Sequence, residues 1–297
     1  MGRHPGRRFR SLYAIYARRR HRALEKFSWK RRYMNASPVS HIAGSIEPSP
    51  VLLCENISVD FAGFQALREV TVSVRSGQTI ALIGPNGAGK STLMNVMSGL
   101  LSPTAGSIRL HDRDVTSSSP SKLARLGVAR SFQNISLFAS MTVYENLRLA
   151  VQRQLFDIAP FWKPVAGYRR LNEATDLALE RSHLTTHRNR LAAELSHGQQ
   201  RALDLGMTLI GDPKILLLDE PLAGVGHDDL DFFLTLLRKV CSNRTVLLVE
   251  HNMDAVMGLA DEVVVLVGGQ VLTKGSPAEI RANPKVRESY LGSGEES

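Results

Sequence analysis

The sequence predicts an α/β fold built around a parallel sheet, and three stretches of the 297-residue chain carry that prediction. Residues 84–92 read GPNGAGKST and lie between a short apolar run rich in β-formers and a helical pattern. Residues 215–218 are fully apolar and lead into two carboxylates, and residues 245–249 lead into a glutamate and a histidine. Continuous apolar runs are typical of strands buried on both faces of a parallel sheet. We therefore expect polar residues to gather where these strands end.

The first stretch fits the pattern G-x-x-x-x-G-K-[ST], with Gly84, Gly89, Lys90 and Ser91 at the defined positions. Its glycines allow backbone N–H groups to turn towards an anion, and the following helix adds about half a positive charge at its N-terminus. Lys90 supplies a point charge for terminal phosphates, and the Ser91 hydroxyl supplies a ligand for magnesium. The predicted phosphate-binding residues are Gly84, Pro85, Asn86, Gly87, Ala88, Gly89, Lys90, Ser91 and Thr92.

Polar residues at the predicted strand ends are candidates for the chemistry. Beside a phosphate loop, Asp219 suits magnesium, directly or through water, and Glu220 suits orientation and deprotonation of the attacking water. Gln133 ends a predicted strand over residues 127–133, and its amide can reach a magnesium ion or its water. His251 can donate to a γ-phosphate from the edge of the sheet, and a purely structural histidine is the alternative.

The composition is that of a globular chain long enough for one large domain or two small ones. Cys54 and Cys241 lie far apart without metal-ligand spacing, so we expect reduced structural thiols in a cytosolic setting. No apolar run approaches the roughly 18 residues of a spanning helix, and no signal peptide is recognisable. We therefore expect a protein that is soluble by itself.

The net charge of +9 is concentrated in an N-terminal leader. Residues 1–46 hold 12 Lys or Arg and one acid, whereas the rest holds 25 basic and 27 acidic residues. Three interpretations of this leader remain open. It binds an anionic membrane surface or nucleic acid, it is an organellar transit peptide, which it resembles, or it is upstream sequence and Met34 is the true start. We expect residues 1–47 to be disordered and dispensable, and residues 292–297 to form a short tail.

A helical subdomain is predicted over residues 134–195, between two α/β parts of the domain 48–291. Apolar residues step along one helical face from residue 141 to about 155 and again from Leu171. Thr142 with Glu145 and Ser276 with Glu279 fit the spacing of a capping box at two helix starts, and Ser196 with Gln199 fits the S-x-x-Q capping box of the helix that follows the subdomain.

Glycine at position 198, in the first turn of that helix, costs about 1 kcal/mol relative to alanine. We therefore expect a close approach at Gly198, for which a phosphate is one candidate. In the alternative interpretation, Ser196 serves only as a cap. Elsewhere, residues 51–61 and 70–74 alternate as half-buried strands do. Phe61 precedes a turn, where its ring either stacks on an adenine or joins the core.

Five separated signals stand in one order along the chain: the phosphate loop, Gln133, LSHGQ at residues 195–199, LLLDE at residues 216–220, and His251. This arrangement resembles the nucleotide-binding subunits of ATP-binding cassette (ABC) transporters over roughly residues 51–291. The resemblance implies a P-loop cassette with a parallel-sheet core, an antiparallel β subdomain and an inserted helical subdomain, which binds ATP and Mg²⁺ and hydrolyses ATP.

Carried over residue by residue, the resemblance assigns Gln133 to the Q-loop, Asp219 and Glu220 to the Walker B pair, His251 to the switch histidine and Phe61 to the adenine-stacking aromatic. Gln133 and Glu220 are thereby expected to be catalytic together with His251, and Ser91, Gln133 and Asp219 are expected to hold the metal.

Two cassettes face head to tail in such ATPases. The resemblance therefore implies that Ser196, Gly198 and Gln199 contact ATP held by the phosphate loop of a second ATPase subunit, related or identical to this one. It also implies transmembrane permease subunits, whose cytoplasmic helix rests near Gln133 and the inserted helices.

A finer resemblance rests on ARSFQNISLFASMTVYENL, on LSHGQQRALDLGMTL and on EHNMDAVMGLAD. These segments are similar to the ATPases of bacterial importers for branched-chain and other hydrophobic amino acids. They imply a peripheral subunit at the cytoplasmic face of the inner membrane that works with a periplasmic binding protein. Urea or short-amide importers remain an alternative, as do soluble ABC ATPases that act on nucleic acid or ribosomes. The single cassette disfavours the soluble class, so we expect no nucleic-acid partner.

Two positions depart from the family pattern. His197 replaces the glycine most common in the middle of the signature, and we expect little effect because Ser196 and Gly198 are retained. Gly226 stands where the family usually has an aspartate that couples the two ATP sites. We expect altered coupling there rather than loss of activity.

Overall fold

Two sheets of different character organise the chain, which this computed structural model describes over residues 49–131, 135–155, 167–242 and 244–291. These residues all lie within one unit of the chain, Pro48–Ser297, and the other unit, Met1–Glu47, falls outside them. The predicted leader, the predicted tail and Gln133 therefore lie outside the described residues.

The larger sheet has six strands in the order β10-β9-β3-β8-β7-β6. Five of these strands run parallel, and β10 pairs antiparallel with β9 at one edge. The predicted parallel sheet is therefore confirmed. Its strands are β3 (Thr79–Ile83), β6 (Val128–Ser131), β7 (Ile215–Asp219), β8 (Thr245–Val249), β9 (Glu262–Val267) and β10 (Gln270–Gly275).

Strands β3, β7 and β8 are buried along their whole length and almost entirely apolar, as expected where both faces of a sheet are covered. In β7, Ile215 and Leu217 belong to the core shared with the smaller sheet, whereas Leu216 and Leu218 belong to the core beneath the helices. The side chains of β8 divide in the same alternating way. Strands β7 and β8 are therefore packed between two separate cores, which fix where the strand ends lie.

The smaller sheet is antiparallel, in the order β2-β1-β4-β5. Its strands are β1 (Leu52–Phe61), β2 (Phe64–Val74), β4 (Ala105–Leu110) and β5 (Arg113–Asp114). The alternation in the sequence indicated the second strand only from Val70, whereas β2 begins at Phe64. Register shifts along the β1–β2 pair interrupt the alternation, which explains why the pattern missed the first half of β2.

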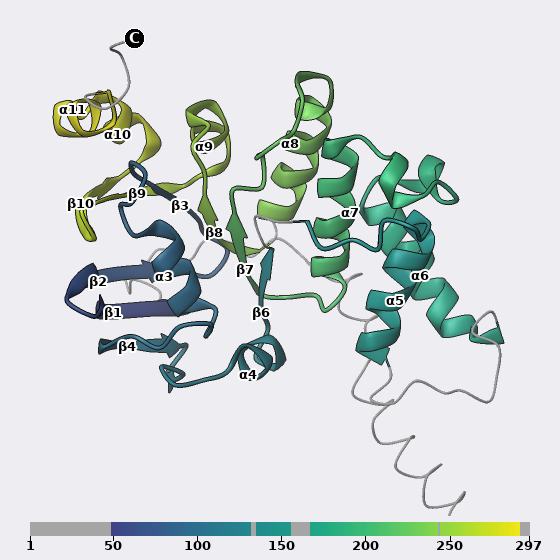
Figure 1. Cartoon of the computed structure of the whole chain (residues 1–297), viewed down its shortest axis with the longest axis horizontal. Helices are drawn as coiled ribbons and strands as arrows, with labels where there is room; N and C mark the ends of the chain where they lie inside the picture. Colours follow the sequence, from purple (N-terminus) through teal and green to yellow (C-terminus); the bar gives the residue numbers. More distant parts are fainter. Residues whose placement is uncertain (1–48, 132–134, 156–166, 243, 292–297) are drawn as a thin grey trace, which may run out of the picture. The chain divides into compact units, whose positions relative to one another are not determined.

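Helices cover the sheets, and α5 and α6 lie within the range 134–195 for which an inserted helical subdomain was predicted. Helices α5, α6 and α7 contact one another, α8 contacts α7, and Figure 1 shows the four side by side. The helices are α3 (Lys90–Met97), α4 (Pro120–Arg125), α5 (Val143–Leu155), α6 (Arg169–Arg181), α7 (His197–Leu209), α8 (His227–Cys241), α9 (Met253–Leu259), α10 (Pro277–Ala282) and α11 (Pro284–Leu291), with short 3₁₀ turns at Thr185–His187 and Ala192–Glu194.

The helix starts follow the capping signals of the sequence. Thr142 and Glu145 exchange side-chain-to-backbone hydrogen bonds ahead of α5, at 2.9 and 3.2 Å. A capping box also opens α10, where the Ser276 N–H donates to Glu279 at 2.7 Å. Over the ranges that the structure describes, every helix is too short or too polar to cross a bilayer.

The two cysteines are free and buried. Burial raises the pKa of Cys54 to about 12 and that of Cys241 to about 11, so both thiols stay protonated near neutral pH. This agrees with the expectation that they are structural.

Candidate nucleotide-binding site

The polar strand ends meet at one edge of the larger sheet. Strands β3, β8 and β7 are parallel neighbours, so the residues that follow them leave the sheet on the same side. The phosphate loop follows β3, Asp219 ends β7, and Glu250 and His251 follow β8. The Glu220 N–H donates to the Val249 carbonyl at 2.9 Å and ties the ends of β7 and β8 together. The expected grouping of these residues is therefore present.

The phosphate loop has its shape because glycine stands where a side chain would strain the backbone or meet it, and at Gly84 a Cβ would lie 2.1 Å from the Leu266 carbonyl oxygen. Gly89 has a φ of 100°, and a Cβ there would lie 2.8 Å from the Ala66 carbonyl oxygen of β2. Gly87 has a φ of 78°, but a Cβ there would meet nothing within 4 Å. The loop thus packs on β2 through Gly89 and borders open space at Gly87, as a cradle for phosphates must.

Lys90 is buried at the start of α3, with 6% of its surface exposed. Its ammonium donates to the carbonyl oxygens of Gly84 at 2.7 Å and Pro85 at 2.9 Å. Burial lowers the pKa of Lys90, and the carboxylates of Glu220 and Asp219 oppose that shift. The lysine is therefore held over the loop, in the field of both carboxylates.

Glu220 and His251 form a pair across the ends of β7 and β8. His251 Nε2 lies 2.8 Å from Glu220 Oε1, and the two side chains are 40% and 20% exposed. Glu220 has a φ of 48°, in the left-handed region that non-glycine residues rarely adopt. Such a backbone conformation costs about 1–3 kcal/mol and is typical of functional sites. It directs a partly accessible carboxylate towards a partly accessible imidazole.

Glu250 was not predicted as a functional residue, yet it organises the loops around this pair. Only 3% of its surface is exposed. Its carboxylate accepts from the backbone N–H of Leu222 at 2.8 Å, of His251 at 2.9 Å and of Asn252 at 3.3 Å. It therefore joins the loop after β7 to the loop that carries His251. A buried acid at the end of an apolar strand was the available signal.

Arg130 of β6 was also missed by the sequence reasoning. Its Nη2 donates to Asp219 Oδ2 at 2.6 Å, and both side chains are only 8% exposed. Its Nη1 donates to Asn95 Oδ1 at 2.8 Å and Ser98 Oγ at 2.9 Å. The available signal was a charged residue inside a predicted strand, because such a residue needs a partner. The partner, Asp219, follows only from the position of β6 beside β7 in the sheet.

The predicted in-trans residues lie at the start of α7. The Gln199 N–H donates to Ser196 Oγ, and the Ser196 N–H donates to Gln199 Oε1, both at 3.3 Å, so the predicted capping box is confirmed. The Gly198 N–H donates to Asp229 Oδ2 at 3.3 Å. Within the described part of the chain, none of these residues bonds to the phosphate loop.

Of the remaining predicted residues, Phe61 ends β1 and is 49% exposed, which excludes a core role. Its stacking on adenine stays a prediction. Gln133 lies outside the described residues. His197 Cδ2 would lie 3.2 Å from a Cβ on Gly224, and Gly226 is the N-cap of α8 without a side-chain cap.

The oxygen donors near the phosphate loop fit Mg²⁺. Ser91 stands in the first turn of α3, directly after Lys90, and Lys90 lies in the field of the Asp219 carboxylate. The described residues contain no cluster of three or more His, Cys, Asp or Glu residues that would form an all-protein metal cage. Mg²⁺ is usually held by one or two protein oxygens plus phosphates and water, so the sparse donor set agrees with this ion.

A phosphate loop, a buried lysine and two carboxylates at the end of a central strand define a P-loop nucleoside triphosphatase. Two families match the sequence: residues 67–223 match "ABC transporter", and residues 270–296 match "Branched-chain amino acid ATP-binding cassette transporter". The chain belongs to the ABC transporter family, as an ATP-binding cassette that hydrolyses ATP. The family resemblance and the fold class expected from the sequence are confirmed.

Named relatives match almost over their full length. The chain is 41% identical over 250 residues to the high-affinity branched-chain amino acid transport ATP-binding protein BraF of Pseudomonas aeruginosa. The alignment covers 82% of this chain and 98% of BraF. The chain is 39% identical over 251 residues to the corresponding protein LivG of Escherichia coli, with 82% and 98% covered.

Solved structures agree with this assignment. A nucleotide-free ATP-binding cassette from an ABC transporter superimposes with a TM-score of 0.71 at 31% identity, covering 81% of this chain and 98% of that one. A cassette in its ADP conformation gives the same score and identity, with 82% and 99% covered.

Proposed function

We propose that this chain is the ATP-hydrolysing subunit of an importer that takes up branched-chain or other hydrophobic amino acids. The observation that carries the ATPase part is the meeting of Lys90, Glu220 and His251 at one sheet edge beside a phosphate cradle. The names of BraF and LivG, which are branched-chain amino acid transport proteins, support the substrate class.

Each residue of the site has a distinct role in hydrolysis. The phosphate-loop N–H groups and Lys90 hold the β- and γ-phosphates, for which Lys90 exchanges its bonds to the loop carbonyls. Glu220 orients the attacking water and takes its proton. His251 lies 2.8 Å from Glu220, and it donates to the γ-phosphate once Glu220 turns to the water.

Ser91 and Asp219 are the proposed Mg²⁺ ligands, with Gln133 as a third. Held by these residues, Mg²⁺ would supply positive charge against the β- and γ-phosphates. Phe61, exposed at the end of β1, stacks on the adenine.

A second ATPase subunit completes the site. Ser196 is exposed at the N-terminus of the 13-residue helix α7, and Gly198 and Gln199 lie in its first turn. A helix N-terminus attracts phosphate, so this turn is suited to the γ-phosphate of ATP held by a partner. The partner is a related ATPase subunit or a second copy of this chain.

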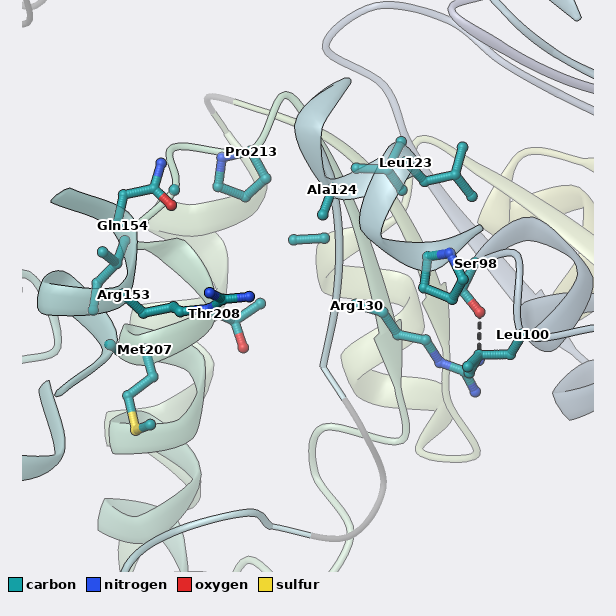
Figure 2. Close-up of a pocket in the computed structure, with 16 residues that line it drawn as sticks. Ser98, Leu100, Leu123, Ala124, Arg130, Arg153, Gln154, Met207, Thr208 and Pro213 are labelled. Carbon is teal, nitrogen blue, oxygen red and sulfur yellow. Dashed lines mark hydrogen bonds between the residues drawn. The ribbon is translucent and has the colours of Figure 1, made fainter. Parts of the chain in front are cut away.

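Permease subunits are the proposed membrane partners, and a groove of about 440 Å³ is their docking site. Figure 2 shows Arg153, Met207 and Thr208 on one wall and Leu123 and Ala124 on the other. The walls come from α5 and α7 on one side and α4 and β6 on the other. A cytoplasmic helix of a permease would therefore contact both the helical part and the sheet of the cassette.

We place the subunit at the cytoplasmic face of the inner membrane, attached through these permeases, with a periplasmic binding protein on the far side. In this proposal the binding protein, and not the cassette, selects the cargo. A pull-down of the complex followed by ligand identification on that binding protein tests the amino-acid assignment. Recovery of urea or a short amide instead would replace it.

The catalytic assignment is tested by Glu220→Gln. This variant is expected to bind ATP with parental affinity, because the phosphate contacts remain. Its turnover should fall by at least about 100-fold, because the general base is lost, and it should accumulate as an ATP-bound dimer. Turnover, nucleotide affinity and size-exclusion mass are measured together. Lys90→Ala serves as the contrast, since it should weaken nucleotide binding itself. Near-parental hydrolysis by Glu220→Gln would remove Glu220 from its role.

A further inference from the structure

Arg130 stands between two features of the cassette, the Mg²⁺ carboxylate and the permease groove. We propose that Arg130 connects them: an acidic side chain entering the groove draws Arg130 away from Asp219 and thereby raises the affinity of the site for Mg²⁺. The proposal rests on the proposed function, because it takes Asp219 as a ligand of Mg²⁺ in an ATPase.

The contact with Asp219 is short and shielded. Arg130 Nη2 lies 2.6 Å from Asp219 Oδ2, and each side chain is 8% exposed. Charge-assisted hydrogen bonds of this length are stronger than neutral ones, and a buried site screens them little. One carboxylate oxygen is thus engaged by a cation within the protein.

This ion pair opposes the binding of a second cation at the same carboxylate. A guanidinium beside Asp219 neutralises its charge and repels Mg²⁺, and the repulsion is stronger in a buried site than in water. Lys90, also buried, adds a further positive charge near Asp219. Loss of the Arg130 contact is therefore expected to favour Mg²⁺.

Arg130 also faces the groove. It lines the groove together with Ser98, to which its Nη1 donates at 2.9 Å, and Figure 2 shows this bond beside Leu100. Leu100 is 52% exposed. A substitution at Leu100 can therefore present a new group to Arg130 while Arg130 and Asp219 themselves are left unsubstituted.

The charge of the groove identifies the occupant's chemistry. Among the described residues that line it are two arginines, Arg130 and Arg153, and no aspartate or glutamate. Arg153 lies on the wall opposite Arg130 and is exposed. A groove with this lining favours an acidic segment over a basic one.

The first experiment measures binding of adenylyl imidodiphosphate, a non-hydrolysable ATP analogue, to the full chain as free Mg²⁺ is varied. Arg130→Met is expected to lower the Mg²⁺ concentration at half-effect by about fivefold or more, the usual range for coupled sites. Arg130→Lys keeps the charge and should stay close to the parent. Arg153→Met removes the same charge from the opposite wall and should leave the midpoint unchanged. Thermal unfolding of each variant reports folding separately.

The second experiment keeps Arg130 and places an acid in the groove. Leu100→Glu is expected to shift the Mg²⁺ midpoint in the same direction as Arg130→Met, whereas Leu100→Gln should not. Combining Leu100→Glu with Arg130→Met should add no further shift, because the new carboxylate then has no arginine to draw away.

The outcomes separate this proposal from the one it rests on. If the parental protein does not bind the nucleotide, or binds it without regard to Mg²⁺, the proposed function fails. If parental binding depends on Mg²⁺ but Arg130→Met leaves the midpoint unchanged or raises it, Arg130 only supports the fold and this proposal alone is overturned. A shift with Leu100→Glu that persists in the Arg130→Met background would overturn the connection to the groove.

Discussion

At the scale of single residues, Gly198 shows two demands on one position. A Cβ at Gly198 would lie 2.3 Å from the Cβ of Asp229 in the first turn of α8, far inside contact distance. The close approach that the sequence led us to expect therefore exists within this chain, and it is made by a carboxylate. The proposed approach of a partner's phosphate concerns the same turn.

A double-mutant cycle separates the two demands. Gly198→Ala is expected to destabilise the protein by about 1–3 kcal/mol through overpacking against Asp229. In an Asp229→Gly background the same substitution should be neutral or stabilising, because alanine has the higher helix propensity. Urea denaturation gives the four free energies of unfolding.

We expect ATP hydrolysis to stay low in the double variant even though its stability returns, because the methyl group still obstructs the partner's phosphate. If hydrolysis recovers with stability, packing against Asp229 is the whole reason for Gly198. The proposed in-trans role would then have to be assigned to Ser196 alone.

The sequence predicted those site residues that stand within local motifs. Lys90 and Ser91 follow from the loop pattern, and Glu220 follows from its place after an apolar strand. Arg130 and Glu250 could not be predicted in this way, because their partners lie on other strands. Their roles follow from the order β8-β7-β6 and from loops that only the sheet brings together.

At the scale of the elements, α7 carries a carboxylate, Asp204, whose charged form is destabilised by burial. Burial raises the pKa of Asp204, while a hydrogen bond from the Ser136 backbone and the charge of Arg201 lower it by less. An acid with a raised pKa in the folded state binds a proton more tightly there than in the unfolded chain. Its ionisation therefore lowers the free energy of unfolding, because the cost of burying the charge exceeds what the Ser136 hydrogen bond and Arg201 return.

This predicts a dependence of stability on pH. From about pH 4, near the ordinary value of 3.8, the contribution of Asp204 to the free energy of unfolding falls as pH rises through its folded pKa. Asp204→Asn removes that loss and can still accept from Ser136, so its advantage over the parent should grow between pH 4 and pH 8. Urea denaturation at several pH values measures the difference.

The exposed Asp231 of α8 offers a matched control, since Asp231→Asn removes a carboxylate without relieving burial. Its effect on the free energy of unfolding at each pH is the baseline with which the effect of Asp204→Asn is compared. A difference for Asp204→Asn that shrinks as pH rises would contradict the assigned cause.

Element boundaries were predictable where one local signal dominates. The capping boxes at Thr142, Ser196 and Ser276 mark the starts of α5, α7 and α10. The start of β2 was not, because bulges in its pairing with β1 break the alternation on which the prediction depended. The continuous apolar runs of β7 and β8 predicted burial on both faces, but not which core each face joins.

At the scale of the whole molecule, the phosphate loop and the start of α7 in one chain belong to two different ATP sites of the proposed assembly, and a second subunit completes each of these sites. Within the described residues, Ser196 and Gln199 bond to each other and not to the loop. Substitution of Ser196 also removes a helix cap, which costs about 1 kcal/mol whatever its other role. Ser276→Ala removes an equivalent cap from α10 and is the control for that cost.

A mixing experiment then tests whether two copies of this chain share their sites. Lys90→Ala and Ser196→Ala are each expected to abolish hydrolysis, whereas Ser276→Ala should keep it at a similar loss of stability. In a mixed homodimer, the intact loop of the Ser196→Ala chain faces the intact signature of the Lys90→Ala chain, and one whole site forms. Random pairing makes half of the dimers mixed, with one good site in two, so an equimolar mixture should regain about a quarter of the parental rate. A mixture that stays inactive contradicts a homodimer, because two copies that each contribute a loop to one site and a signature to the other must complement each other. The obligatory partner is then a different ATPase subunit.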